Sequence, residues 1–134
     1  MKQLTEYILE SLSNELFDFL NKLDNSNVIF APDNIKEKYD IKELTISKTL
    51  NDNDDYVTLD KIIMNNKGYG NGSMFMRDFC KWADMYGKIL CLTPSDSFGA
   101  TSVSRLKKFY KKFGFVENKG KKSDFNIKET MYRK

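Results

Sequence analysis

The chain contains no histidine, only two cysteines and no long hydrophobic run. The absence of histidine excludes Ser-His-Asp and Cys-His catalysis, and it removes a ligand that most zinc sites use. A general acid or base must therefore be Asp, Glu, Tyr, Lys, Cys or water. No apolar stretch approaches the roughly 20 residues that a membrane-spanning helix requires. Residues 1–6 also lack the pattern of a secretion signal, so we expect a cytoplasmic protein without a membrane partner.

The two cysteines, Cys80 and Cys91, fall in a predicted helix and in the strand that follows it. Neither belongs to a metal-ligand pair, so we expect no metal site and interpret both as reduced core residues. The length of 134 residues, of which 40% are hydrophobic, fits one domain with a substantial core. We therefore expect a single domain that extends over residues 1–134.

Charge is distributed unevenly along the chain. Residues 1–100 carry 11 basic and 16 acidic side chains, whereas residues 101–134 carry 11 basic and 3 acidic ones. This basic C-terminal third is either a surface for coenzyme phosphates, nucleic acid or an acidic protein, or simply a solvated helix face. Phe109 and Phe113 lie among its lysines at helical spacing, and we interpret them as core residues.

Hydrophobic periodicity predicts strands that alternate with helices, which is typical of an α/β fold. We expect helices over residues 5–23 and 74–86, and a last helix that Ser102 or Ser104 caps and that ends at Gly114. Strands are expected over residues 28–31, 41–50, 56–64, 88–93, 115–117 and 129–133. Residues 35–40 are ambiguous.

A glycine-rich turn, Lys67-Gly68-Tyr69-Gly70-Asn71-Gly72-Ser73, joins the strand over 56–64 to the helix over 74–86. Such a turn can direct several backbone N–H groups, together with the positive end of the helix dipole, toward one anion. It is neither a Walker loop nor a dinucleotide fingerprint, because it lacks a terminal Gly-Lys-Ser/Thr and lies in the middle of the chain. The residues alone therefore predict a phosphate or pyrophosphate site, with an ordinary glycine-rich turn as the alternative.

Two segments resemble signature motifs of the GNAT family of N-acetyltransferases. Residues 67–75 are similar to the family's Arg-Gly-x-Gly-x-Gly/Ala-Ser-x-Leu segment, with Lys67 for Arg and Phe75 for Leu. Residues 106–115 are similar to its Ala-x-x-x-Tyr-x-x-x-Gly-Phe signature. The resemblance covers about residues 56–115 and implies a mixed, mostly antiparallel twisted sheet with helices on both faces. The helix over 5–23 ahead of the first strand departs from the usual family start.

The resemblance implies that acetyl-coenzyme A binds as a co-substrate. In the family the glycine turn holds the pyrophosphate, and the next strand splays away so that the pantetheine arm lies in the gap. The coenzyme residues implied here are Lys67, Gly68, Tyr69, Gly70, Asn71, Gly72, Ser73, Ile62, Ile63, Met64 and residues 90–93, including Thr93. Where the family often has an asparagine that contacts the coenzyme, this chain has Val103, and the flanking Ser102 and Ser104 are candidates to replace it.

Tyr110 matches the family tyrosine near the thioester sulfur, which implies a general acid, whereas periodicity alone would favour a core aromatic. Asp60 is the one carboxylate within the strand over 56–64 that can match a commonly acidic family position, and we expect it to be the general base. Burial would raise its pKa, which suits a base. An exposed Asp60, or one paired with a lysine, is the alternative. Asp96, in the polar loop 93–102, is a candidate contact for a cationic amine.

The sequence thus predicts an enzyme that transfers an acetyl group directly to a primary amine in a ternary complex. The acceptor would be a small molecule or a protein, nucleic acid is less favoured, and the enzyme would be a monomer or homodimer. One alternative is a catalytically inactive GNAT-fold module whose basic C-terminal third binds nucleic acid or a protein partner. Another is a small regulatory factor carried by a phage, which the short, Asn/Lys-rich chain permits.

Overall fold

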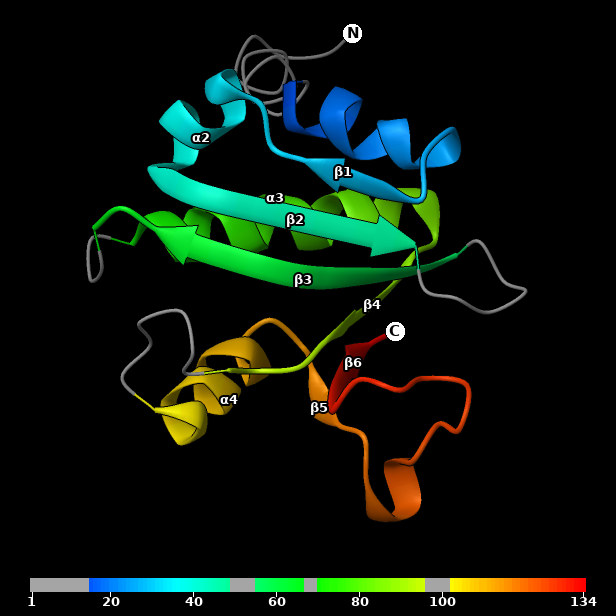
Figure 1. The fold of residues 1–134 in the computed structure, drawn as a ribbon. Coiled ribbons are helices and arrows are strands. Elements are labelled where there is room, and N and C mark those ends of the chain that lie inside the picture. Colours follow the sequence, from blue (N-terminus) through cyan, green and yellow to red (C-terminus); the bar gives the residue numbers. More distant parts are fainter. Residues whose placement is uncertain (1–14, 49–54, 67–69, 96–101) are drawn as a thin grey trace, which may run out of the picture.

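The computed structural model describes residues 15–48, 55–66, 70–95 and 102–134 (Figure 1). A six-stranded sheet with the order β1-β2-β3-β4-β6-β5 runs through it. Its strands are β1 (Val28–Phe30), β2 (Ile41–Lys48), β3 (Tyr56–Met64), β4 (Ile89–Leu92), β5 (Val116–Glu117) and β6 (Met131–Arg133). All neighbouring strands are antiparallel except β3 and β4, which are parallel. The predicted α/β class and the mixed, mostly antiparallel sheet are confirmed.

Helical segments separate most of the strands. They are a helix described over residues 15–20, η1 (Asn21–Asp24), α2 (Asp33–Tyr39), α3 (Asn71–Tyr86), α4 (Val103–Lys111) and η3 (Gly120–Lys122). The predicted helix over 5–23 is confirmed for residues 15–20, while residues 1–14 lie outside the described part of the chain. The ambiguous segment near 35–40 is α2, which buries Ile35 and Tyr39 four residues apart on one helix face.

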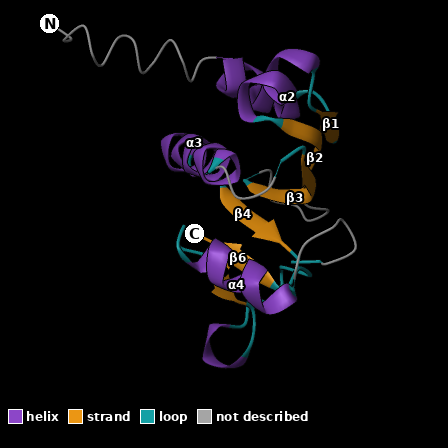
Figure 2. Cartoon of the chain, turned by 90° about the vertical axis from the view of Figure 1, so that its left-hand side faces the viewer, coloured by secondary structure: helices purple, strands orange, loops and turns teal. Residues whose placement is uncertain are grey.

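The helix over 15–20, α2, α3 and α4 lie on one face of the sheet, because their buried side chains share one core cluster (Figure 2). Phe79 of α3 and Tyr110 of α4 share one core with Leu90 and Leu92 of β4. Cys91 points to the opposite face because side chains alternate along a strand. There a smaller cluster is formed by Tyr56, Cys91, Ile127 and Tyr132. Helices on both faces were expected, but within the described residues a loop segment that carries Ile127 covers this second cluster.

A β-α-β unit connects β3 to β4 through α3, because parallel neighbours require a crossover connection. Gly70 forms the N-cap of α3 with a φ of 80°, and Gly87 forms its C-cap with a φ of 67°. Glycine adopts such positive φ values without steric cost. Since α3 begins at Asn71 and not at Met74 as predicted, the second half of the glycine turn belongs to the first turn of the helix.

A β-bulge interrupts β3 at Asp60. Thr45 of β2 pairs with Lys61, whereas the next residue, Ile46, pairs with Leu59, so Asp60 has no partner on β2. Pairing between β3 and β4 ends at Leu59, which is the residue just before Asp60 and pairs with Leu92. Because β3 continues to Met64, the two parallel strands part at this point.

Candidate functional site

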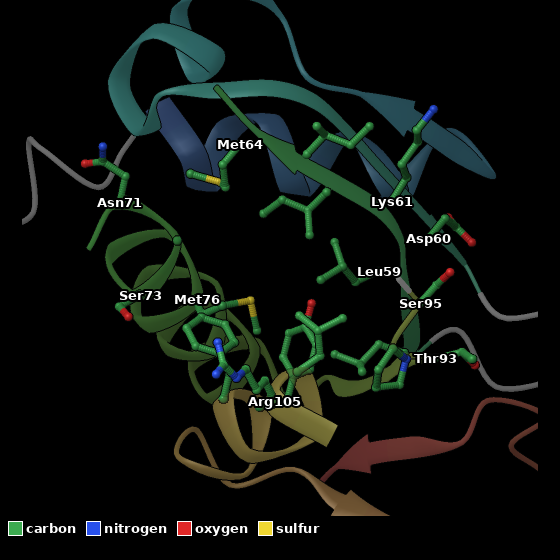
Figure 3. A pocket seen from close by; sticks show the side chains of 18 of the residues that line it. Leu59, Asp60, Lys61, Met64, Asn71, Ser73, Met76, Thr93, Ser95 and Arg105 are labelled. Atoms are coloured by element: carbon green, nitrogen blue, oxygen red, sulfur yellow. The ribbon is translucent and has the colours of Figure 1, made fainter. Parts of the chain in front are cut away.

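A cavity of about 640 Å³ opens where β3 and β4 part (Figure 3). Its wall is formed by residues 59–64 and 66, residues 70–73, Met76, residues 92–95, Arg105, Leu106, Phe109 and Tyr110. Small-molecule sites in proteins occupy roughly 300–1,000 Å³, so this cavity has the size of a ligand site. It brings together β3, the start of α3, the end of β4 and α4.

The first turn of α3 forms one end of the cavity. The N–H of Met74 donates to the carbonyl of Gly70 at 3.0 Å, so the three amides before it have no acceptor within the helix. In Figure 3, Asn71 and Ser73 lie together on this side, away from Asp60. Unpaired amides and the positive end of the helix dipole favour an anion here.

Gly72 leaves the space in front of this helix end open. A Cβ at Gly72 would meet only the ring of Phe109, at an ordinary contact distance of 3.9 Å. The backbone there does not have a positive φ, in contrast to Gly70. The missing side chain at Gly72 therefore provides room beside the cavity, and it is not a requirement of the backbone.

Arg105 adds an exposed cation to the cavity wall. The side chain of Ser102 caps α4 by accepting a hydrogen bond from the Arg105 N–H at 3.1 Å. Sequence reasoning included Arg105 in the basic C-terminal third, whose possible ligands include coenzyme phosphates, but did not single it out, because one cation among many near α4 resembles a solvated side chain. The usable signal was helical spacing, which places Arg105 on the same helix face as Phe109, four residues later.

Tyr110 combines burial with a position in the cavity wall. Its side chain is 7% exposed. Its ring makes edge-on contacts with Phe109 and Phe115, with ring centroids 5.3 and 5.8 Å away. Burial raises the pKa of Tyr110 to about 12. The hydroxyl therefore holds its proton at neutral pH and is available as a donor.

Asp60 lies on the side of the cavity where Thr93 and Ser95 also lie (Figure 3). Although the residue is exposed, partial burial of its carboxyl raises its pKa, and the charge of Glu129 raises it further. A hydrogen bond with Ser47 acts in the opposite direction. The net upward shift makes this carboxylate a stronger base than an ordinary Asp side chain.

Glu129 is a second carboxylate near this end that sequence reasoning missed. Its Oε1 accepts a hydrogen bond from the Thr58 hydroxyl at 3.0 Å, and its buried Oε2 has no hydrogen-bond partner among the described residues. The next residue, Thr130, donates its N–H to the Thr93 hydroxyl at 3.2 Å, which connects this segment to the cavity wall. No local pattern identifies Glu129, because 71 residues separate it from Thr58.

The remaining predicted residues fall into three groups. Lining the cavity are Ile62, Ile63, Met64, Gly70, Asn71, Gly72, Ser73, Leu92 and Thr93. Outside the described wall are Ser102, Ser104, Leu90 and Cys91: Ser102 caps α4, Ser104 is exposed, and Leu90 and Cys91 are buried within the sheet. Outside the described residues altogether are Lys67, Gly68, Tyr69 and Asp96. That Ser102 or Ser104 replaces the missing asparagine stays a prediction, and the first turn of α4 also brings Arg105 to the cavity wall.

Cys80 and Cys91 are both buried thiols, as predicted. Within the described ranges, no cluster of three or more His, Cys, Asp or Glu side chains could hold a metal ion. None of the helices in the described part of the chain is long and apolar enough to cross a membrane. Comparisons of the chain with protein-family models, with curated proteins and with solved structures found no match.

Proposed function

We propose that this protein is an acetyl-coenzyme A-dependent N-acetyltransferase with a GNAT-type fold. The observation that carries the proposal is the cavity between the parting strands β3 and β4, with the N-terminus of α3 at one end and Tyr110 in the wall. The motif resemblance implies a gap of this kind for pantetheine and a helix end of this kind for pyrophosphate. The chain order β3, glycine turn, α3, β4 and α4 also supports the proposal.

The described residues fit the parts of acetyl-coenzyme A. The amides of Asn71, Gly72 and Ser73 are suited to the pyrophosphate, with Arg105 as a nearby cation. From Ile62 to Met64, the edge of β3 that faces away from β2 has no strand partner among the described residues. Its peptide groups are therefore available to the amide groups of the pantetheine arm.

Bound acetyl-coenzyme A supplies a thioester whose acyl carbon accepts an amine nitrogen, so that a C–N bond forms and the C–S bond breaks. Asp60, or a water that it orients, takes the proton from the acceptor ammonium and leaves a nucleophilic amine. Tyr110 gives its proton to the departing sulfur and regains one, by way of water, from the nitrogen as the amide forms. The upward pKa shifts keep the acid protonated and make the base stronger before reaction.

Asp60 gives the end of the cavity opposite α3 a negative charge, and Glu129, which lies outside the cavity wall, is close enough to raise the pKa of Asp60. A primary amine carries a positive charge at neutral pH and is favoured beside carboxylates. This charge supports a cationic amine acceptor, either a small molecule or a side chain of a protein.

Calorimetric titration with acetyl-coenzyme A tests the proposal directly. We expect micromolar binding, equivalent to about −8 kcal/mol, and at least roughly tenfold weaker binding by the Gly72→Glu variant because its carboxylate would face the coenzyme phosphates. Gly72 is the better position for this test, because any side chain at Gly70 would also strain the backbone at its φ of 80°.

Ser26→Glu is the matched control, since it adds the same charge on the exposed turn before β1. This variant should bind like the wild type. No binding by the wild-type protein would overturn the proposal. Tight binding without transfer to any primary amine would favour the catalytically inactive binding module.

A further inference from the structure

The loop between β5 and β6, residues 118–130, presents an exposed aromatic ring that the proposed coenzyme site does not use. We call it the Phe125 loop, and it is the orange-to-red segment between β5 and β6 in Figure 1. The side chain of Phe125 is 98% exposed. A phenyl ring gains free energy from burial, so its full exposure at the tip of an ordered loop indicates a surface for a partner.

Hydrogen bonds of a single side chain hold the Phe125 loop in shape. The amide nitrogen of Asn118 donates to the carbonyls of Asp124, Ile127 and Glu129 at 3.0–3.2 Å. Its oxygen accepts the Asp124 N–H at 2.6 Å. These hydrogen bonds fix the loop backbone to the Asn118 side chain at the base of the loop.

The tip of the loop is a turn with Phe125 and Asn126 at its centre, closed by the Ile127 N–H that donates to the Asp124 carbonyl at 3.1 Å. Ile127, which is 4% exposed, anchors the turn in the cluster with Tyr132. The hydrogen-bonded turn and the buried side chain of Ile127 therefore hold Phe125 in a position that faces solvent.

The Phe125 loop is strongly basic. The loop carries four exposed lysines, which are Lys119, Lys121, Lys122 and Lys128. Asp124, the carboxylate nearest the ring in sequence, is paired with Lys134 at 2.8 Å. Lys119 pairs with Glu117 at 3.7 Å, while Lys121, Lys122 and Lys128 form no ion pair within the described residues.

We propose that the Phe125 loop binds single-stranded nucleic acid, with the ring of Phe125 stacked on a base and Lys121, Lys122 and Lys128 at the phosphates. Stacking requires an unpaired base, because the bases of a duplex are already stacked on one another, and lysines supply the sequence-independent phosphate attraction. An anionic membrane fits less well, because Asp124 and Asn126 flank the ring and would enter the interface with it.

The experiment is a fluorescence-anisotropy titration of the full chain with a labelled oligothymidylate of about 12 nucleotides, a length within the usual site sizes. Phe125→Ala should raise the Kd roughly tenfold, which lies within the range measured for base–aromatic stacking. Replacement of Lys121, Lys122 and Lys128 by Gln should reduce the slope of log affinity against log salt by about 2, since each phosphate contact contributes roughly 0.7 for single strands.

Matched controls are available at the other edge of the sheet and elsewhere on the surface. Phe30 of β1 is 70% exposed, so Phe30→Ala removes a comparable ring and should leave the Kd unchanged. Lys22, Lys42 and Lys81 are exposed, and their joint replacement by Gln makes the same change in net charge. This second triple variant should keep most of the salt slope.

Three results would overturn the proposal. The first is no binding by the wild type, and the second is equal effects of Phe125→Ala and Phe30→Ala. The third is binding to vesicles of anionic lipid that depends on Phe125 while the oligonucleotide does not bind. The acetyl-coenzyme A titration is independent of all three results. The proposed coenzyme site and the proposed nucleic-acid binding by the Phe125 loop are therefore tested separately.

Discussion

At Tyr110, a single substitution can separate the packing of the aromatic ring from the proposed chemistry of the hydroxyl. Its ring is held by Phe109 and Phe115, while the residue also lines the cavity. No hydrogen bond of its hydroxyl occurs within the described residues. Replacement by Phe therefore keeps the ring contacts and removes only the hydroxyl, which is the proposed proton donor.

Tyr110→Phe should lower kcat for acetyl transfer about a hundredfold, the lower part of the range for general acid catalysis. The Kd for acetyl-coenzyme A should stay within about twofold, and the free energy of unfolding within about 0.5 kcal/mol. Since the pKa of Tyr110 is about 12, its ionisation should not limit the wild-type rate below about pH 11. Steady-state kinetics across pH, calorimetry and urea denaturation measure these quantities.

An unchanged kcat would assign Tyr110 to the core alone. A parallel fall in kcat and in unfolding free energy would show that the hydroxyl supports the structure. Tyr56→Phe is a suitable control, because Tyr56 is buried in the smaller cluster on the opposite face of the sheet. That variant should keep the wild-type kcat.

Among the elements, α3 carries glycines for two different physical reasons. Gly70 and Gly87 cap its ends at φ values of 80° and 67°, which side chains disfavour. Gly72 lies within the first turn without a positive φ. Two of these glycines are explained by the backbone, and the third is explained by the space that it leaves beside the cavity.

Gly70→Ala and Gly87→Ala should each lower the free energy of unfolding by about 1 kcal/mol, because Ala is strained in the left-handed region. Gly72→Ala should be neutral or stabilise by a few tenths of a kcal/mol, since Ala is the better helix former and its Cβ has room. The same Gly72→Ala variant should nevertheless bind acetyl-coenzyme A less tightly than the wild type. Urea denaturation and calorimetry give the two values.

The opposite pattern is also informative. A Gly72→Ala variant that loses as much stability as Gly70→Ala, with unchanged coenzyme affinity, would indicate that contact with Phe109 requires the glycine. In that case the first turn of α3 would have no assigned ligand, and the proposed pyrophosphate site would be contradicted.

In the whole molecule, Arg133 of β6 connects the helices on either side of the cavity. Its Nε donates to the Phe113 carbonyl, just after α4, at 2.7 Å. Its two terminal nitrogens donate to the carboxylate of Asp84 on α3 at 2.8 and 3.0 Å. One guanidinium thereby helps to set the position of α3 and α4 relative to the sheet, and so the shape of the cavity between them.

The hydrogen bonds from Arg133 hold the pKa of Asp84 below its usual value. A lowered folded-state pKa stabilises the fold above the unfolded pKa of about 3.9, and this stabilisation is lost as pH falls through the folded value. Asp84→Asn should therefore lower the unfolding free energy near neutral pH. The loss should be at most about 1 kcal/mol, because the carboxylate is largely exposed.

The measurement is urea denaturation of the wild type and Asp84→Asn at about pH 7 and about pH 3, on either side of the unfolded pKa. The gap between the two proteins should narrow at the lower pH. Asp18→Asn, which removes an exposed carboxylate from the helix over 15–20, is the control and should change stability little. A gap that does not depend on pH would contradict the role assigned to the Arg133–Asp84 pair.

Most of the elements that surround the cavity, and their order in the chain, could be predicted from local patterns. β3 begins and ends at the predicted residues Tyr56 and Met64, because an apolar run between turn residues is a local signal. The start of α3 was predicted three residues late, since the glycines that suggested a loop are compatible with a first helical turn. Periodicity could not predict which face of the sheet each helix covers. It indicates that one side of a helix is buried, but not against which face of the sheet.

The sequence by itself determined the kinds of elements and their order around the glycine turn, and it predicted a common site for Gly70 and Tyr110, which both line the cavity. These follow from periodicity, glycine preferences and short motifs, which act between residues close in the chain. Only the tertiary structure decided where β3 and β4 part, that Arg105 lines the cavity, that Glu129 lies near Asp60, and that Phe125 faces solvent on an ordered turn. These features depend on strand register and on contacts between distant residues, and a shift of one residue would change every one of them.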